Sequence, residues 1–354
     1  MFKILFLILI LALLFVPQKK ESRSLTWLFL LSTFLVMGLR HMYCYQDTFG
    51  YVQHYNDIQT MPWEQITDYF NKDVIFWYLS KAISFIAEGN YTIWLLSISF
   101  IYLVSFYNLI KKESMLPAVS ALVMIVIGLY YFAFTGLRQT LALAFITQSI
   151  YYLLNREAKK ALMMTLIASV FHSTSLVFLL SFPFTHIKLN KKTLAIYLIV
   201  GLSIYSLGTR FSAILNSITI TDRFAYYADS DSTLSFTGFF IKLLLLISSY
   251  YFLGNTRNEY KNIVLIHLAI IGLITQSLSI YIAEMFRISM YFSISYVILF
   301  ANSLSQYRKR TGRIKLPVLL VVLFLAYILV ANNSLINKNY FFFFDNPVGI
   351  INSL

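Results

Sequence analysis

Four arginines are candidates for function, three at the ends of apolar segments and one in a polar loop between two of them, because a charged side chain in or at the edge of a membrane is costly. They are Arg40, Arg138, Arg223 and Arg287. A guanidinium group offers paired N–H donors that match the oxygens of a phosphate group. The four side chains therefore predict a site for an anionic ligand, and phosphate is the anion that they fit best.

The segment around Arg138 carries the clearest motif. Gly136 introduces Arg138 and Gln139 at the start of an apolar helix, where free backbone N–H groups and the helix dipole already favour an anion. An arginine that merely contacts lipid headgroups from a loop is the alternative, but Gln139 would have no purpose in a plain hairpin. Both side chains are therefore assigned to ligand binding.

A second group of polar residues stands late in the chain. Glu284, Arg287 and Tyr291 follow one another at intervals of three and four residues, so all three share one face of a helix. A structural ion pair between Glu284 and Arg287 is the alternative, although such a pair is expensive to bury in lipid without a purpose. The three residues are candidates for ligand binding, and Glu284 is also a candidate base.

Two further residues are candidates for a catalytic base. Asp47 follows Arg40 and precedes Tyr51 and Tyr55 at intervals of four residues. These residues form either a site or an interfacial belt of aromatic side chains with an arginine that reaches the headgroups. His172 lies midway along an apolar stretch, where a histidine is more often a structural donor at a kink than a base. We expect it to line the cavity in either case.

The composition indicates what kind of element carries these residues. Of 354 residues, 59% are hydrophobic and 12% are charged, and the mean hydropathy is +0.71. A soluble domain carries about 25% charged residues, so the chain is expected to be an all-α, polytopic integral membrane protein. Apolar windows predict about eleven transmembrane helices. They lie at residues 3–16, 25–40, 91–110, 116–134, 137–154, 161–183, 193–208, 237–253, 262–283, 287–304 and 316–332.

Positive charge sets the expected orientation, because Lys and Arg favour the cytoplasmic side of a membrane. Basic clusters that belong inside lie at residues 19–23, 111–112, 156–160 and 308–315. Residues 40–90 and 209–236 are then outside loops, and the four arginines map to the outer side together with Asp47. For Arg223, in the second loop, a simple ion pair with Asp222 or a solvated side chain is the alternative to ligand binding.

Two segments do not fit a plain series of spans. Residues 64–88 carry too many charges to cross but have an apolar helical face, so we expect an amphipathic helix on the outer leaflet. Lysines within residues 188–192 also belong inside, although a single apolar stretch, residues 161–183, precedes them. Either that stretch is a re-entrant pair broken at residues 171–174, which we expect, or those lysines lie outside. Residues 1–354 are expected to form one membrane domain.

At these residues the chain resembles the EpsG-type family, a branch of the Wzy-like polymerases of capsule, exopolysaccharide and O-antigen. The likeness extends over about residues 38–292 and departs from the usual Gly-Asp form only at Gln46, which precedes Asp47. Four motifs carry it: Arg40, Asp47, Tyr51 and Tyr55; the turn Gly136, Leu137, Arg138 and Gln139; Phe171, His172 and Ser173; and Arg287, Tyr291 and Phe292.

The resemblance implies a GT-C-like glycosyltransferase that joins oligosaccharide repeat units carried on undecaprenyl diphosphate, at the outer face of the bacterial cytoplasmic membrane. It suggests Asp47 as the base for the acceptor hydroxyl, with His172 or Glu284 as substitutes. Arg138 and Arg287 would hold the diphosphate of the leaving group. Arg40 and Arg223 would orient phosphate or an acidic sugar.

The remaining polar candidates are assigned to substrate binding. Gln139, Tyr51, Tyr55 and Tyr291 would bind substrate, and tyrosine rings suit stacking on sugars. Four arginines can neutralise a diphosphate, so we expect no metal and no other cofactor. The expected partners are the lipid-linked oligosaccharide, membrane lipids and a regulator of chain length, but no nucleic acid. A flippase for the same lipid-linked units and a membrane O-acyltransferase of surface sugars are the alternatives.

Overall fold

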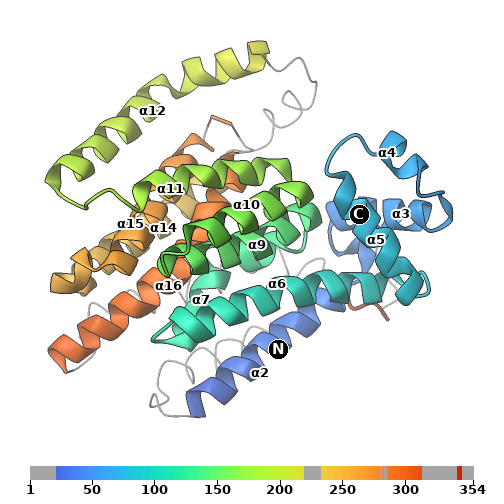
Figure 1. Ribbon diagram of the computed structural model, residues 1–354, viewed down its shortest axis with the longest axis horizontal. Coiled ribbons are helices and arrows are strands. Elements are labelled where there is room, and N and C mark those ends of the chain that lie inside the picture. Colours follow the sequence, from blue (N-terminus) through green and yellow to red (C-terminus); the bar gives the residue numbers. More distant parts are fainter. Residues whose placement is uncertain (1–20, 219–232, 280, 283–284, 313–340, 345–354) are drawn as a thin grey trace.

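The computed structural model describes residues 21–218, 233–279, 281–282, 285–312 and 341–344. Within these ranges it contains fourteen α-helices, three 3-10 helices and no β-strand. A single bridge pairs Arg40 with Phe342. The helices lie side by side in a bundle, with a smaller group of helices at one end (Figure 1). The expected all-α class is confirmed.

Four described helices are long and apolar enough to cross a bilayer. They are α6 (Tyr91–Glu113), the stretch Gly238–Asn258 that contains most of α14 (Thr233–Leu253), α15 (Tyr260–Leu278) and α16 (Met285–Thr311). The chain is therefore a membrane protein, while the count of about eleven spans and the GT-C architecture stay predictions. The expected spans at residues 3–16 and 316–332 lie outside the described residues.

Other apolar segments form shorter helices than the windows predict. Residues 25–40 lie mostly in α2 (Glu21–Gly38). The single span expected at residues 116–134 is wrong as drawn, because two helices occupy it, α7 (Pro117–Val126) and α8 (Leu129–Phe132). Gly128 between them has φ +84°, a conformation that glycine adopts without steric cost. Hydropathy does not register such a turn, since its flanking residues are equally apolar.

The break expected within residues 161–183 is confirmed. Helix α10 (Ala158–Phe171) ends at Phe171, and His172 takes an extended conformation with φ −155° and ψ 110°. The chain continues as a 3-10 helix, η2 (Ser173–Leu180), and as α11 (Ser181–Phe184). The preceding helix α9 (Leu137–Leu154) packs against α10, and α12 (Lys191–Ile218) runs along the outside of the bundle (Figure 1).

A separate hydrophobic core holds the elements of the expected outside segment 40–90. These are η1 (Met42–Cys44), α3 (Gln46–Thr60), α4 (Gln65–Tyr69) and α5 (Val74–Ile86), which lie together at one end of the molecule (Figure 1). Buried Val52, Ile58 and Trp77 belong to this core. Buried Lys81 donates to the backbone oxygen of Ile58 over 2.8 Å at the end of α3, where a helix favours a cation. We call this group the α3–α5 unit.

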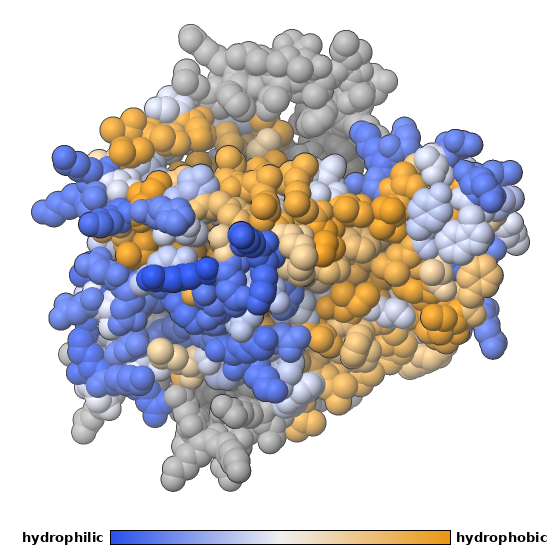
Figure 2. Space-filling model, viewed as in Figure 1, coloured by the Kyte–Doolittle hydropathy of each residue, from blue (hydrophilic) through white to orange (hydrophobic). Residues whose placement is uncertain are grey.

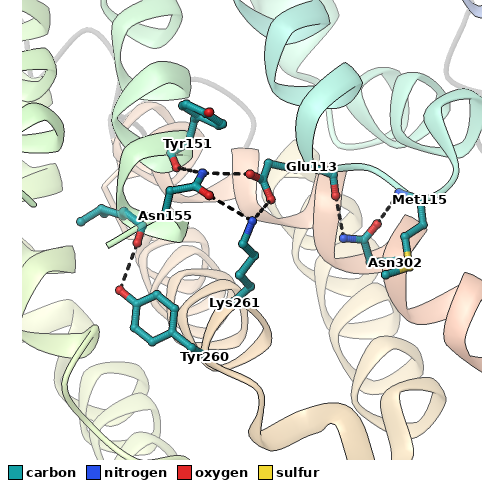
Figure 3. A network of polar contacts seen from close by, with 8 residues as sticks. Glu113, Met115, Tyr151, Asn155, Tyr260, Lys261 and Asn302 are labelled. Atoms are coloured by element: carbon teal, nitrogen blue, oxygen red, sulfur yellow. Dashed lines mark hydrogen bonds and ion pairs between the residues drawn. The ribbon is translucent and has the colours of Figure 1, made fainter. Parts of the chain in front are cut away.

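At the opposite end of α6 and α9, a polar network joins four helices (Figure 3). The buried carboxylate of Glu113 accepts from Lys261 over 2.6 Å and from Asn155 over 2.9 Å. Asn302 of α16 donates to the backbone oxygen of Glu113 and accepts from the backbone N–H of Met115. The network fixes the relative positions of the far ends of α6 and α9 and of the start of α15.

The surface supports a membrane setting. Figure 2 shows apolar surface over the middle of one face, with hydrophilic surface gathered where α15 begins and α16 ends. Large apolar side chains are widely exposed, among them Phe100 at 58%, Leu198 at 63% and Phe240 at 61%. A water-soluble protein rarely leaves so many exposed. Basic side chains at the hydrophilic end stand over tyrosine rings: Lys111 on Tyr107, Lys112 on Tyr151, Arg156 on Tyr260 and Arg310 on Tyr307.

Candidate functional site

The carboxylate of Asp73 is the meeting point of three elements. Its Oδ2 lies 2.8 Å from Nδ1 of His172 and 3.1 Å from Nη1 of Arg138. Its Oδ1 accepts a hydrogen bond from the backbone N–H of Ser173 over 3.2 Å. The Asp73 side chain is only 7% exposed. The start of α5, the start of α9 and the break after α10 therefore converge on one nearly buried carboxylate.

The backbone of Asp73 is unusual for its position. Asp73 is the N-cap residue of α5 and has φ 53° and ψ 39°, a left-handed conformation that costs energy for any residue with a side chain. An aspartate at this position normally accepts from backbone N–H groups of its own helix, but Asp73 makes no such bond. Its carboxylate is directed at His172 and Arg138 instead. A strained residue whose side chain leaves its local partner is a mark of a functional site.

Arg138 stands in the first turn of α9 and is partly exposed. Its Nε donates to the hydroxyl of Tyr51 over 3.2 Å, and its guanidinium carbon lies 5.9 Å from the centre of the Tyr51 ring. A guanidinium has five N–H donors, and the contacts with Asp73 and Tyr51 use two of them. The glycine before it is required by space, because a Cβ at Gly136 would lie 2.6 Å from Cζ of Phe132.

His172 presents one ring nitrogen to Asp73 and leaves the other uncommitted. Nδ1 contacts Asp73, whereas Nε2 has no hydrogen bond within the described part of the chain, and the side chain is 17% exposed. A neutral imidazole that donates through Nδ1 presents Nε2 as an acceptor. The extended backbone at His172 places its ring at the end of α10 and its neighbour Ser173 against Asp73.

A second polar cluster adjoins the first through neighbouring residues in the chain. Gln139, next to Arg138, donates through Nε2 to the backbone oxygen of Arg287 over 2.7 Å. Thr174 hydrogen-bonds the hydroxyl of Tyr291 over 2.9 Å. Oε1 of Gln139 and Oγ of Ser175 are buried without a hydrogen-bond partner among the described residues. Because such atoms cost free energy when unsatisfied, they indicate where a ligand or water completes the site.

The charges around Asp73 keep its carboxylate ionised. Burial acts to raise its pKa, but the hydrogen bond and charge of His172, the charge of Arg138 and the N–H of Ser173 together hold the pKa below its ordinary value of 3.8. An ionised carboxylate can orient an imidazole and stabilise its protonated form. At neutral pH, Asp73 is therefore suited to support His172 rather than to take up a proton itself.

The arrangement combines two chemical functions. A carboxylate that orients an imidazole is a general-base device, since Nε2 can remove a proton from a hydroxyl. Arginine donors beside it stabilise negative charge that develops on a leaving group. The site can therefore activate a hydroxyl and bind an anion at the same place.

Six of the candidates named from the sequence lie in these two clusters. They are Arg138, Gln139, His172, Tyr51, Arg287 and Tyr291. They come from α3, α9, the break after α10 and α16, so folding brings together positions as far apart in sequence as Tyr51 and Tyr291.

Three other candidates lie elsewhere. Asp47 is exposed in the first turn of α3, and no hydrogen bond or ion pair joins it to the clusters within the described residues. Tyr55 is fully buried, with its ring stacked on Trp94 at 4.5 Å. Arg40 is fully buried, donates to the backbone oxygens of Met37 and, over 3.2 Å, of Phe134, and so ties α2 to the segment before α9.

For Tyr55 and Arg40 the structure corrects the sequence interpretation, because neither side chain is accessible to a substrate. The last two candidates, Arg223 and Glu284, lie outside the described residues.

Asp73 and Thr174 are the residues that sequence reasoning missed. Asp73 counted only as one of the charges that exclude a span at residues 64–88. An aspartate directly before an apolar helix is a normal N-cap signal, and nothing in the local pattern distinguishes a cap from a site. The distinction comes from residues about 65 and 99 positions later in the chain, which only the fold brings near.

The chain matches one known protein family. A model of the EpsG family matches residues 23–344 and so covers every described residue of both clusters. No curated protein and no solved structure matches the chain. The family indicates a membrane protein of polysaccharide synthesis and is associated with glycosyltransferase-like polymerases. The resemblance found in the sequence is thus confirmed over most of the chain, and the protein belongs to the EpsG family.

Proposed function

We propose that this protein is a polysaccharide polymerase that joins oligosaccharide repeat units carried on undecaprenyl diphosphate. The observation that carries the proposal is the hydrogen bond between Asp73 and His172, directly beside Arg138, in a member of the EpsG family. Glycosyl transfer from a lipid diphosphate needs a base for the acceptor hydroxyl and cations for the leaving group. The cluster offers both.

The reaction has a simple balance. The acceptor's sugar hydroxyl attacks the anomeric carbon of the donor, the new glycosidic C–O bond forms, and the bond between that carbon and the phosphate oxygen breaks. His172 Nε2 takes the hydroxyl proton, and the lipid diphosphate leaves with the bonding electron pair. Asp73 holds the imidazole in position and stabilises its protonated form.

The diphosphate binds at the arginines. Arg138 still has N–H donors beyond those that Asp73 and Tyr51 use, and paired donors suit phosphate oxygens. Arg287 stands on the other side of Gln139, which bonds its backbone oxygen. The two arginines neutralise the leaving group without a metal. Gln139 and Tyr291 are buried, so they position the site through their bonds to the backbone of Arg287 and to Thr174. Arg223 and Glu284 remain candidates for further contacts with substrate.

This mechanism moves the base from Asp47 to His172. Asp47 is exposed, and among the described residues no hydrogen bond or ion pair joins it to the clusters. Among the described residues, His172 has a carboxylate partner at Nδ1, and its Nε2 makes no hydrogen bond. We therefore assign the proton transfer to His172 and treat Asp47 as dispensable for the chemical step.

The active site faces the outside of the bacterial cytoplasmic membrane. Support comes from the basic side chains at the far ends of α6, α9 and α16, among them Lys111, Lys112, Arg156 and Arg310. These belong on the cytoplasmic side, and the Asp73 cluster stands at the opposite ends of α6 and α9. Lipid-linked units reach the site within the membrane, with the α3–α5 unit above it.

The length of surface polysaccharide in living cells tests this function. A strain without the gene is complemented with the wild type, H172A or D47N. We expect long chains from the wild type and D47N, and single repeats on the surface from H172A. Absence of any exported material would indicate a flippase, and chains of normal length with altered decoration would indicate an acyltransferase. Either result would contradict the proposal.

A further inference from the structure

A row of aromatic rings leads away from Arg138 through the α3–α5 unit. Tyr51, under the guanidinium, lies 6.0 Å from Trp77 between ring centres. His54, one turn further along α3, stands edge-on to Trp77 at 5.5 Å. Phe70 stacks on the same indole at 4.2 Å. The rings therefore connect Arg138 with residues at the outer surface of the α3–α5 unit.

At its outer end the row becomes exposed and polar. The side chains of His54 and Asp57 are 46% and 49% exposed, and Tyr69 is 52% exposed. The hydroxyl of Tyr69 donates to Oδ2 of Asp57 over 3.4 Å, and Nδ1 of His54 lies 3.6 Å from the same oxygen. A carboxylate, an imidazole and an aromatic ring thus share one open surface.

Their exposure distinguishes His54 and Tyr69 from the aromatic rings that only pack inside the α3–α5 unit. Tyr55 and Trp94, which stack on each other on the inner side of α3, are fully buried. His54 and Tyr69, in contrast, present ring surface and polar atoms that a ligand can reach.

The indole of Trp77 provides an independent sign of a ligand. Its N–H is buried and has no acceptor among the described residues. Buried donors are almost always satisfied, and the half-exposed ring of His54 stands edge-on to the same indole. An oxygen supplied by a ligand at this surface would satisfy the indole.

We propose that His54, Asp57, Tyr69 and Trp77 form a carbohydrate subsite for an uncharged sugar ring of the acceptor. The exposed ring of Tyr69 packs against the C–H surface of the sugar, and the polar atoms of His54, Asp57 and the Trp77 indole bind its hydroxyls. Asp57 accepts two such hydroxyl bonds and disfavours an acidic sugar by repulsion. The proposal rests on the proposed function and deepens it, because the subsite holds the acceptor while its terminal hydroxyl reaches His172.

Binding of lipid-free oligosaccharide tests the subsite apart from the diphosphate site. The probe is a set of oligosaccharides of one to three repeat units, released from the surface polysaccharide of the same strain. Protein in nanodiscs is titrated by calorimetry, and saturation-transfer NMR records which sugar protons contact it. D57N is nearly isosteric at an exposed position, and E64Q is a matched control, since Glu64 is an exposed carboxylate of the same unit.

We expect the wild type and E64Q to bind equally. D57N should bind about tenfold more weakly, because it loses charge-assisted hydrogen bonds. In polymer synthesis, D57N should raise the acceptor concentration for half-maximal rate by a similar factor and leave the maximal rate within about twofold. No binding by the wild type, or equal binding by D57N, would overturn the subsite.

The two proposals fail in different ways. If the wild type makes polymer but D57N binds the probe as well as the wild type does, the subsite is wrong and the polymerase stands. If the probe binds in a D57N-sensitive way but folded wild type makes no polymer from lipid-linked units, the subsite stands and the polymerase is wrong.

Discussion

One oxygen of the Asp73 carboxylate contacts both His172 and Arg138. Each of these partners therefore uses only part of its hydrogen-bonding capacity on Asp73. His172 keeps Nε2 for a proton, and Arg138 keeps donors for an anion. The Asp73 carboxylate makes no cap bond to its own helix and contacts these two partners instead. We therefore expect the three side chains to work as one unit, so that removal of one affects the others.

Substitution of Asp73 tests this unit. We expect D73N and H172Q each to lower the rate of sugar transfer about a hundredfold or more, the range of general-base catalysis. The double variant should be no slower than H172Q, because Asp73 acts through His172. Rates are measured with lipid-linked substrate, and melting temperatures confirm folding. If the rate loss of the double variant equals the product of the two single losses, Asp73 does not act through His172. A larger rate loss in D47N than in H172Q would contradict the assignment of the base to His172.

Stability at low pH tests the ionised state of Asp73. Its pKa is lowered in the folded protein, so the carboxylate contributes stability above its unfolded pKa, and this contribution disappears as pH falls through the folded value. The difference in melting temperature between wild type and D73N should therefore be constant near neutrality and shrink from about pH 5 downward. Asp68 is an exposed carboxylate of the same unit, and D68N serves as the comparison. A difference that grows on acidification would contradict the lowered pKa.

At the scale of elements, the site depends on where helices begin and end rather than on their faces. Arg138 and Gln139 open α9, and His172 follows the end of α10. Both boundaries could be predicted from the sequence, since Gly136 marks the first and the polar residues 172–174 mark the second. The turn at Gly128 could not, because the flanking residues are as apolar as the helices. Asp73 could not either, because its partners lie far away in sequence.

Gly136 permits a test of the boundary before Arg138. We expect G136A to destabilise the protein by about 1–3 kcal/mol, because its Cβ would press on the ring of Phe132. Gly50 in α3 has open space around its Cβ position, so G50A should be neutral or stabilising. Thermal unfolding in detergent compares the two. The loss of stability caused by G136A should be smaller in an F132L background. An equal loss in both backgrounds would contradict the proposed contact with Phe132.

At the scale of the whole molecule, the bundle separates two polar layers. The Glu113 network fixes one end of α6 and α9, and the Asp73 cluster occupies the other. Composition predicted the helical class and the membrane setting, because few charges in a long apolar chain leave no alternative. The number of spans could not be fixed in the same way, since the apolar helices α7 and α8 are too short to cross and are buried in the protein.

The charge balance of the site leads to a prediction about metals. In the proposed mechanism the positive charge at the diphosphate comes from Arg138 and Arg287, so we expect polymer synthesis to continue in excess EDTA at a rate within about twofold of the untreated protein. The measurement follows product formation with purified protein before and after chelation. Complete loss of synthesis, restored by a divalent ion, would show that the arginines do not suffice.

The most direct test is synthesis by the purified protein. Wild type, R138A and E64Q are placed in nanodiscs with undecaprenyl-diphosphate-linked repeat units from the same strain, and the products are separated by length. The account predicts a ladder of products from the wild type and E64Q and none from R138A, with all three folded. The absence of a ladder from folded wild type, or an equal ladder from R138A, would contradict it.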